Sequence, residues 1–279
     1  MIKLLRGNLN RLFKNKVFWL CVAAIILCSV FMIRQGVLLM ESDRKPVTLD
    51  EYYFRLGPFV ALFLSVFIPM FLGAEYSFGT IRNKLTMGFT RDKIYLSYFL
   101  SSLIGVGIIL TAWFLAGLTG IFQLGVWKSG AANIIISFLV TILYSTALTA
   151  FFTFFSVMIT GRSASVVFQI VFALGIILAA STLYNRLCEP EESRGIVFVN
   201  GELVMTEPEA NPMYIGGVLR KIYVALVNIL PTGQGILMLH EESAESVPLN
   251  IPLQIVSSIL IAFVMTAVGI SVFRKKDLK

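Results

Sequence analysis

The sequence is poor in the residues that most enzymes use for chemistry. It contains one histidine, His240, and three cysteines, Cys21, Cys28 and Cys188. His240 stands beside two glutamates in a polar region, where a solvated loop residue is more typical than a metal ligand. Cys21 and Cys28 fall within one apolar run and are expected to be buried structural thiols. Because the sequence shows no Ser/His pair and no metal-binding cluster, we expect neither a catalytic site nor a cofactor in this chain.

The chain also lacks the phosphate-binding pattern G-x-x-x-x-G-K-[ST], so no ATP site of that kind is expected. Its long apolar runs contain no Asp, Glu, Lys, Arg or His near their middle. Proton-coupled pumps and many ion-driven carriers place ionisable groups at that depth of the membrane. The absence argues against a secondary transporter and against a cation channel.

What the chain does contain is apolar sequence in abundance. Hydrophobic residues make up 57% of the 279 positions and charged residues 14%, and the mean hydropathy is +0.83. Soluble domains have about 45–50% apolar and about 25% charged residues. The formal net charge is +7, but the basic residues cluster at the ends of apolar runs. This pattern indicates orientation in a membrane rather than nucleic-acid binding.

The apolar runs predict a single all-α transmembrane domain over residues 1–279 with six spans. Their lengths suit a hydrocarbon core of about 30 Å, and the first run lacks a small-residue cleavage site, so it is expected to stay as an anchor. The predicted spans are 17–33, 58–74, 94–118, 134–159, 164–184 and 251–273. Residues 1–16 combine five basic residues with apolar residues at helical spacing. They predict an amphipathic helix in the interface, although a simple basic flank would also carry these charges.

Residues 185–250 form the longest polar section, with nine acidic and four basic residues. Within it, residues 214–231 have apolar positions at helical period and end at Pro231. A seventh span is disfavoured because Arg220 and Lys221 interrupt this stretch, and a charge at mid-membrane costs about 2.5–3.5 kcal/mol on insertion scales. Two interpretations of residues 214–231 therefore stay open: a surface helix and a partly inserted helix.

Six spans place both termini on one side of the membrane. With the N-terminus inside, the inner segments contain 14 basic residues (Lys and Arg) and 3 acidic residues. The outer segments then contain 9 basic and 13 acidic residues. Basic loops resist translocation. We therefore expect a multi-pass protein of the cell (plasma) membrane with both termini cytoplasmic and with residues 185–250 outside.

The fourth span is rich in small hydroxyl residues and in phenylalanine. Ser145, Thr146, Thr149, Thr153 and Ser156 either pack helices closely together or line a substrate path. The phenylalanines around Thr153 are expected to face lipid and neighbouring helices. Both interpretations of the hydroxyl residues stay open at this point.

Between the second and third spans lies a polar, basic stretch, residues 75–93. It reads EYSFGTIRNKLTMGFTRDK. An acidic residue, a Gly-Thr pair, a basic residue and a Ser/Thr-Arg pair before the next span resemble the first cytoplasmic loop of ABC-2 type exporter membrane subunits. In this sequence the matching residues are Glu75, Gly79, Thr80, Arg82, Thr90 and Arg91. Gly88-Phe89 stands where many members of that family have a proline. The six-span layout, the N-terminal helix and the long outer section also match, so the resemblance covers essentially the whole chain.

The resemblance implies the ABC-2 type exporter fold and a permease that moves an amphipathic or lipid-like substrate, such as a peptide or antibiotic, outward. A second permease subunit would pair with this chain, and separate cytoplasmic ATP-binding cassette ATPase subunits would hold ATP and Mg²⁺. A short helix at 78–85 would couple the ATPase to the spans. The coupling residues implied are Glu75, Gly79, Thr80, Arg82, Asn83, Lys84 and Arg91.

Specific roles follow for these coupling residues. Gly79 would permit a tight entry to the helix, Thr80 would cap its first turn, and Glu75 would form a salt bridge at the membrane boundary. Arg82 and Lys84 would pair with acids of the ATPase. Alternatively, these charges only enforce orientation.

A function of another class also fits the sequence. The chain would then be a non-transporting membrane scaffold or sensor whose acidic section 185–250 binds an extracellular ligand. An ATPase partner would favour the exporter, and a histidine kinase partner without an ATPase would favour the sensor.

Overall fold

The computed structural model describes residues 1–43, 49–77, 79–124, 130–194, 196–199, 202–205, 207–238 and 247–276. Six of its helical stretches are long and apolar enough to cross a membrane, by length and composition. This fits an all-α multi-pass membrane protein. The six stretches are Lys16–Ser42, Phe54–Glu75, Arg91–Leu124, Ala132–Met158, Arg162–Cys188 and Ile251–Lys275.

In the first half of the chain, every regular element of the described residues is a helix. After the short helix α1 come the long helix α2 and a set of helices that includes two 3₁₀ turns. The bounds are α1 Ile2–Phe13, α2 Lys16–Asp43, α3 Leu49–Tyr53, η1 Phe54–Phe59, α4 Val60–Ser77, α5 Thr80–Thr86, α6 Arg91–Gly117, η2 Leu118–Gly120 and α7 Ile121–Leu124. Helices α8 (Ala131–Met158) and α9 (Arg162–Cys188) follow.

Each predicted span overlaps a long helix, and most helices extend further than predicted. Helix α2 continues past Arg34 to Asp43, and α6 begins at Arg91 rather than at residue 94. The predicted spans stop at the first charged residue because they follow apolar runs. A helix can continue past that residue, because its charged side chains can reach water. The second span starts as a 3₁₀ turn, η1, that contains Pro58. Proline lacks the N–H that a regular helix interior requires.

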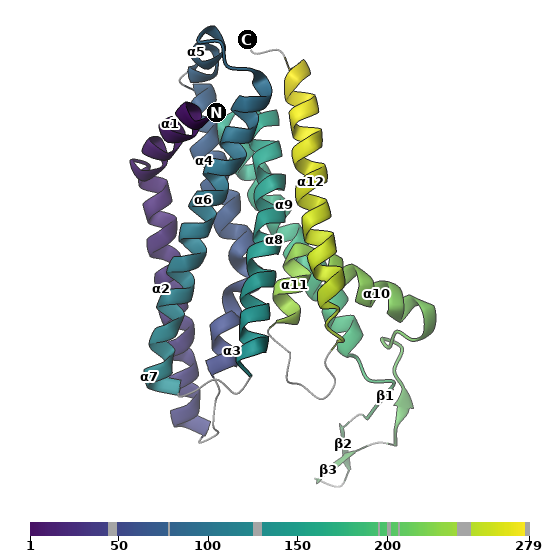
Figure 1. Ribbon diagram of the computed structural model, residues 1–279. Coiled ribbons are helices and arrows are strands. Elements are labelled where there is room, and N and C mark those ends of the chain that lie inside the picture. The colour runs from purple at the N-terminus through teal and green to yellow at the C-terminus, as the bar shows by residue number, and fades with distance from the viewer. Residues whose placement is uncertain are drawn as a thin grey trace.

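The long helices run side by side, and α8 lies between α4, α6 and α12 (Ile251–Lys275). Helix α1, helix α5 and the C-terminal end of α12 lie at the same end of the bundle (Figure 1). We call this end the basic end. Large side chains fill the core between the helices; those fully or almost fully buried include Phe18, Phe67, Phe71, Tyr95, Tyr98, Trp113, Tyr144, Phe152 and Phe273.

Most hydroxyl residues of α8 are buried inside this bundle, and Thr146 is half-buried. Ser145, Thr149, Thr153 and Ser156 are fully inaccessible, and the Ser156 hydroxyl donates back to the carbonyl of Phe152. The Thr149 hydroxyl likewise donates to the carbonyl of Ser145, whereas the hydroxyls of Ser145 and Thr153 are buried without a hydrogen-bond partner among the described residues. Small side chains let helices approach closely. Their burial favours the packing interpretation over a substrate path. Of the neighbouring phenylalanines, Phe151 and Phe155 pack against the rings of Phe168 and Phe172 on α9.

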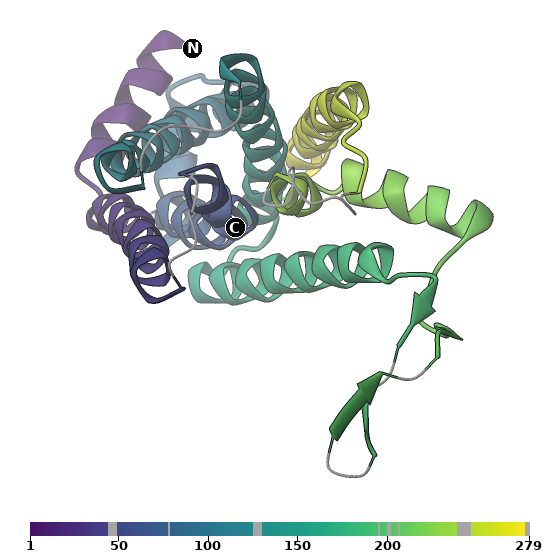
Figure 2. The same ribbon diagram turned by 90° about the horizontal axis from the view of Figure 1, so that it is seen from below.

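The section after α9 contains strands, which the sequence analysis did not predict. Strands β2 (Ile196–Val199) and β3 (Glu202–Met205) pair antiparallel, with Ile196 opposite Met205. The shorter β1 (Glu192–Ser193) pairs with β4 (Glu209–Ala210). Figure 2 shows that this segment projects away from the helices. A sequence signal existed, because the dipeptide Asn200-Gly201 between two β-prone runs is typical of a hairpin.

The helix predicted at 214–231 is observed as α10, Gly217–Ile229, which is not among the candidate spans. It lies across the direction of the long helices (Figures 1 and 2). Its exposed apolar face, Val218, Leu219, Ile222 and Leu226, suits a helix lying in the membrane interface. Pro231 ends α10, as predicted, and also begins a second helix, α11 (Pro231–Leu237), which packs against η1, α8 and α9.

The corner between α10 and α11 depends on Gly233. A Cβ atom at this position would lie 2.3 Å from the carbonyl oxygen of Val227. Because that atom belongs to the backbone, no side-chain rotation can relieve the clash. Gly233 therefore permits the sharp reversal that buries α11.

We predict that Gly233→Ala destabilises the protein by about 1–3 kcal/mol, as overpacking of a tight contact does. Gly175→Ala in α9 is the matched control, because a Cβ atom there meets nothing within 4 Å. Thermal unfolding in detergent should show a lower midpoint for the first variant and an unchanged or slightly higher midpoint for the second. Equal midpoints would contradict the packing argument.

Candidate functional site

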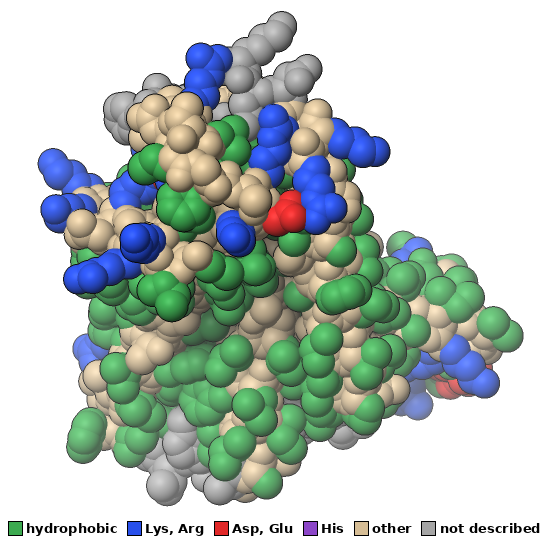
Figure 3. Space-filling model, turned by 45° about the horizontal axis from the view of Figure 1, so that its top comes forward, with side chains coloured by type: hydrophobic (Ala, Val, Ile, Leu, Met, Phe, Trp, Pro, Cys, Tyr) green, Lys and Arg blue, Asp and Glu red, His purple; other side chains and the backbone are tan. Residues whose placement is uncertain are grey.

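The basic end brings the predicted coupling residues together. Lys and Arg side chains gather there, and hydrophobic side chains cover much of the bundle below (Figure 3). Helix α5, Thr80–Thr86, lies at this end between α4 and α6. It corresponds to the helix predicted at 78–85, although Phe78 lies outside the described residues.

Gly79 makes the sharp entry to α5 possible. Its φ of 62° lies in the left-handed region, which side chains with a Cβ atom rarely adopt. This agrees with the role predicted for Gly79. Thr80 has another role than the predicted cap: Gly79 occupies the cap position, and no side chain caps α5. The Thr80 hydroxyl instead donates to the Glu75 carboxylate at 2.5 Å.

Glu75 is the centre of the site. Near the end of α4, its side chain is only 2% exposed, yet it contacts two cations. Lys84 Nζ lies 2.7 Å from its Oε1 atom, and Arg11 of α1 forms a second ion pair with the same oxygen. The Tyr98 hydroxyl of α6 donates to Oε2 at 3.0 Å. The salt bridge predicted for Glu75 is confirmed, but its partners belong to this chain.

Further hydrogen bonds tie these groups to α1. Lys84 Nζ donates to the Asn8 side-chain oxygen at 3.0 Å, and Asn8 Nδ2 donates to Ser97 Oγ at 3.1 Å. Arg11 also stacks over the Phe71 ring, with 4.6 Å between its guanidinium carbon and the ring centroid. We call Asn8, Arg11, Glu75, Thr80, Lys84 and Tyr98 the Glu75 cluster; it joins α1, α4, α5 and α6.

The pairing of Lys84 with an acid of a partner protein stays a prediction, but within this chain Lys84 already pairs with Glu75 and its side chain is only 13% exposed. Lys84 points inward because the buried carboxylate of Glu75 requires a positive counter-charge. Arg82 and Asn83, by contrast, are exposed on the outer side of α5. The two basic residues of this helix thus divide their roles between the interior and the surface.

Arg91 also contacts its own chain. Its guanidinium donates to the carbonyl oxygens of Phe273 at 3.1 Å and of Arg274 at 2.9 Å, and a further bond reaches Lys276. Carbonyl groups at the end of a helix lack partners within that helix, so Arg91 satisfies the C-terminal turn of α12. Beside it, Asp92 forms a two-bond ion pair with Arg274 at 2.5 and 2.6 Å.

Lys276 makes an equivalent contact with α8. Its Nζ atom donates to the carbonyl oxygens of Val157 and Met158, at 2.5 and 2.9 Å. Positive charge is favourable at the C-terminal end of a helix dipole. We call Arg91, Asp92, Arg274 and Lys276 the Arg91 clamp. The 75–93 stretch is thereby tied to α1, α4 and α6 through the Glu75 cluster, and to α8 and α12 through this clamp.

Burial changes the proton affinity of the two cations in the Glu75 cluster. Removal from water, and next the positive charge of Arg11, lower the pKa of Lys84 to about 7. Burial also lowers the pKa of Arg11 to about 10, and Tyr98 partly opposes that change. Burial first, and next the excess positive charge of two cations that share one carboxylate, explain why the proton of Lys84 is held weakly.

The Glu75 cluster and the Arg91 clamp connect helices of this chain through ion pairs and hydrogen bonds. Among the described residues, no group of three or more His, Cys, Asp or Glu side chains could hold a metal ion. His240 lies outside the part of the chain that the structure describes, and Cys21, Cys28 and Cys188 are free thiols. No protein-family model matches this chain, and neither does any curated protein.

Sequence reasoning missed Asn8, Arg11 and Tyr98 as members of the Glu75 cluster. For Asn8 a signal was present, because it stands between Leu4 and Leu12 at four-residue spacing on the buried side of α1. A polar residue within an apolar stripe needs a hydrogen-bond partner in the interior. Tyr98 gave no such signal, since tyrosine is common in membrane helices near their ends.

We predict that Glu75→Gln destabilises the protein by about 3–5 kcal/mol, since it leaves two partly buried cations without a counter-charge. Asp92→Asn removes the other carboxylate of the 75–93 stretch, but its side chain is 40% exposed. That control should change stability much less. The measurement is thermal or denaturant unfolding in detergent, and similar losses in both variants would contradict a central role for Glu75.

The pKa of Lys84 predicts a pH dependence with a definite sign. An unfolded lysine has a pKa of 10.5, against about 7 in the folded protein. Between these values the unfolded chain binds more protons, so the free energy of unfolding should rise with pH, by at most about 1.4 kcal/mol per unit. Lys84→Met should flatten this rise. An unchanged slope in the variant would show that other groups cause it.

Proposed function

We propose that this chain is the membrane-spanning permease subunit of an ATP-driven exporter of the ABC-2 type. In this proposal the basic end faces the cytoplasm of a plasma-membrane protein, as the excess of Lys and Arg favours. A separate ATPase subunit binds ATP and Mg²⁺ and acts on α5. A second permease subunit, identical or related, completes the transport path for an amphipathic or lipid-like substrate such as a peptide or antibiotic.

The two-sided character of α5 is the observation that supports this proposal best. Its inner side, through Thr80 and Lys84, joins the Glu75 cluster, whereas Arg82 and Asn83 remain exposed. A protein that pushes on the exposed side would move a rigid unit that includes α1, α4 and α6. Rigid-body tilts of packed helices are an established way to convert a local push into a larger change.

The Arg91 clamp extends the same argument to the last span. Arg91 and Asp92 begin α6 and contact the C-terminal end of α12. A shift of the 75–93 stretch would therefore act on α12 as well. Arg91 serves in this proposal as a positioning residue between spans, instead of a contact to the ATPase.

A membrane scaffold or sensor remains the second candidate, and the projecting β2–β3 segment favours it. This segment stands clear of the helices (Figure 2) and is available to a ligand or partner. Removal of residues 196–205 separates the two functions. An exporter should keep its ATPase partner after this deletion, whereas a sensor should lose its ligand.

We predict that Arg82→Glu weakens association with the ATPase subunit and uncouples ATP hydrolysis from export, because it reverses an exposed charge on α5. Arg34→Glu, an exposed charge in α2 outside the Glu75 cluster, is the control and should leave both unchanged. Pull-down of the tagged protein from membranes, with mass spectrometry, should recover a subunit with the phosphate-binding pattern. Recovery of a histidine kinase and no ATPase would overturn the proposal.

A further inference from the structure

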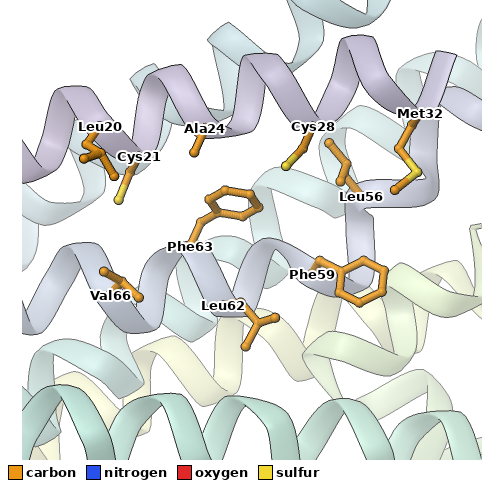
Figure 4. A pocket seen from close by; sticks show the side chains of 10 residues that line it. All are labelled: Leu20, Cys21, Ala24, Cys28, Met32, Leu56, Phe59, Leu62, Phe63 and Val66. Atoms are coloured by element: carbon orange, nitrogen blue, oxygen red, sulfur yellow. The ribbon is translucent and has the colours of Figure 1, made fainter. Parts of the chain in front are cut away.

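Helices α2 and α4, together with η1, leave an apolar groove on the membrane-facing surface of the bundle (Figure 4). Its volume is about 450 Å³. On the α2 side, the small residues Cys21, Ala24 and Cys28 recur at spacings of three and four and so fall on one face of the helix. Their small volume leaves the groove open beside the rings of Phe59 and Phe63.

The groove has the length of one leaflet of a bilayer. It runs along α2 from Leu20 to Met32, about 18 Å at 1.5 Å per residue. Half of a hydrocarbon core of about 30 Å is of similar length. Trp19, half-exposed, stands just before Leu20, where a membrane–water boundary favours tryptophan. The groove therefore begins at the boundary on the basic end and continues into the hydrocarbon.

Near this beginning stand two cations, Lys16 and Arg162, for which the described part of the chain shows no acidic partner. Lys16 is exposed and lies four residues before Leu20, on the same side of α2. On α4, Gly73 follows Val66 by two helical turns, and Arg162 packs against it: a Cβ atom at Gly73 would lie 2.9 Å from Arg162 Cγ. The Nε atom of Arg162 is buried without a hydrogen-bond partner. Glu75, the nearby acid, is already shared by Arg11 and Lys84.

We propose that this groove binds one anionic phospholipid, with an acyl chain along α2 and α4 and its phosphate between Lys16 and Arg162. This inference goes beyond the transport function and does not depend on it. Acyl chains in the bilayer are as apolar as the groove, so the groove provides fit rather than selectivity. The headgroup provides the selectivity, because basic residues near the surface attract anionic lipids.

Charge also argues against a second copy of this chain as the occupant. In a two-fold symmetric contact each surface meets its own copy. Lys16 and Arg162 of one copy would then face the same cations of the other, and juxtaposed like charges oppose association. A phosphate group, by contrast, provides the negative charge that this end of the groove lacks.

Native mass spectrometry of the purified protein tests the headgroup site. With vesicle lipids added back, the protein should retain one phosphatidylglycerol in preference to phosphatidylcholine. Lys16→Ala and Arg162→Ala should each reduce this preference about fivefold, the effect of one basic residue at a membrane surface. Arg34→Ala, in the same helix as Lys16 but near its other end, should not. Equal retention of the two lipids by the unchanged protein would overturn the proposal.

A second experiment tests the groove itself. Ala24→Trp should fill the groove and abolish lipid retention, whereas Ala267→Trp on the exposed side of α12 should leave retention unchanged. Thermal unfolding separates loss of lipid from loss of fold, and the Lys16 and Arg162 variants decide the question if Ala24→Trp does not fold. Retention of lipid by Ala24→Trp, or a Cys28–Cys28 cross-link between two copies after oxidation in membranes, would also overturn it.

Discussion

The arrangement of the basic end depends on one buried carboxylate. Glu75 lies out of contact with water and shares its oxygens with Arg11, Lys84, Thr80 and Tyr98. A charge removed from water costs several kcal/mol unless opposite charges and hydrogen bonds compensate it. If helices α1, α4, α5 and α6 separated at this point, the carboxylate of Glu75 would lose the partners that compensate its burial. The Glu75 cluster therefore ties two short and two long helices to one another, while Arg82 and Asn83 of α5 stay exposed.

The two ends of the bundle are held together by different chemistry. At the basic end, ion pairs and cation-to-carbonyl contacts join the helices, through the Glu75 cluster and the Arg91 clamp. Around α10 and α11 the buried polar groups are neutral: Gln234 donates to the Asn228 carbonyl and Gln254 donates to the Asn228 side chain. Neutral amides can be buried at lower cost than charges. Changes of pH or salt should therefore act on the basic end far more than on this region.

Much of the architecture could be predicted from the sequence because it follows from local properties. Apolar runs of membrane length predicted the six long helices, and Gly79 predicted the tight entry to α5. The strands Ile196–Val199 and Glu202–Met205 were not predicted, although Asn200-Gly201 was a usable hairpin signal. The inward orientation of Lys84 and the contact of Arg91 with α12 could not be predicted. Arg91 meets carbonyl groups more than 180 residues later. Lys84 bonds the nearby Glu75, but also Asn8 of α1, which lies far away along the chain.

The sequence by itself determined the class of the protein and the side on which its charges gather. Hydropathy and charge are summed along consecutive residues, so no knowledge of packing is needed to read them. Only the tertiary structure decided which charges are used inside and which remain on the surface. Lys84 and Arg82 are two residues apart and chemically similar, and the helical turn between them places one against Glu75 and the other in solvent. Such a choice depends on what the folded chain brings to each side of a helix, and a list of residues does not contain that information.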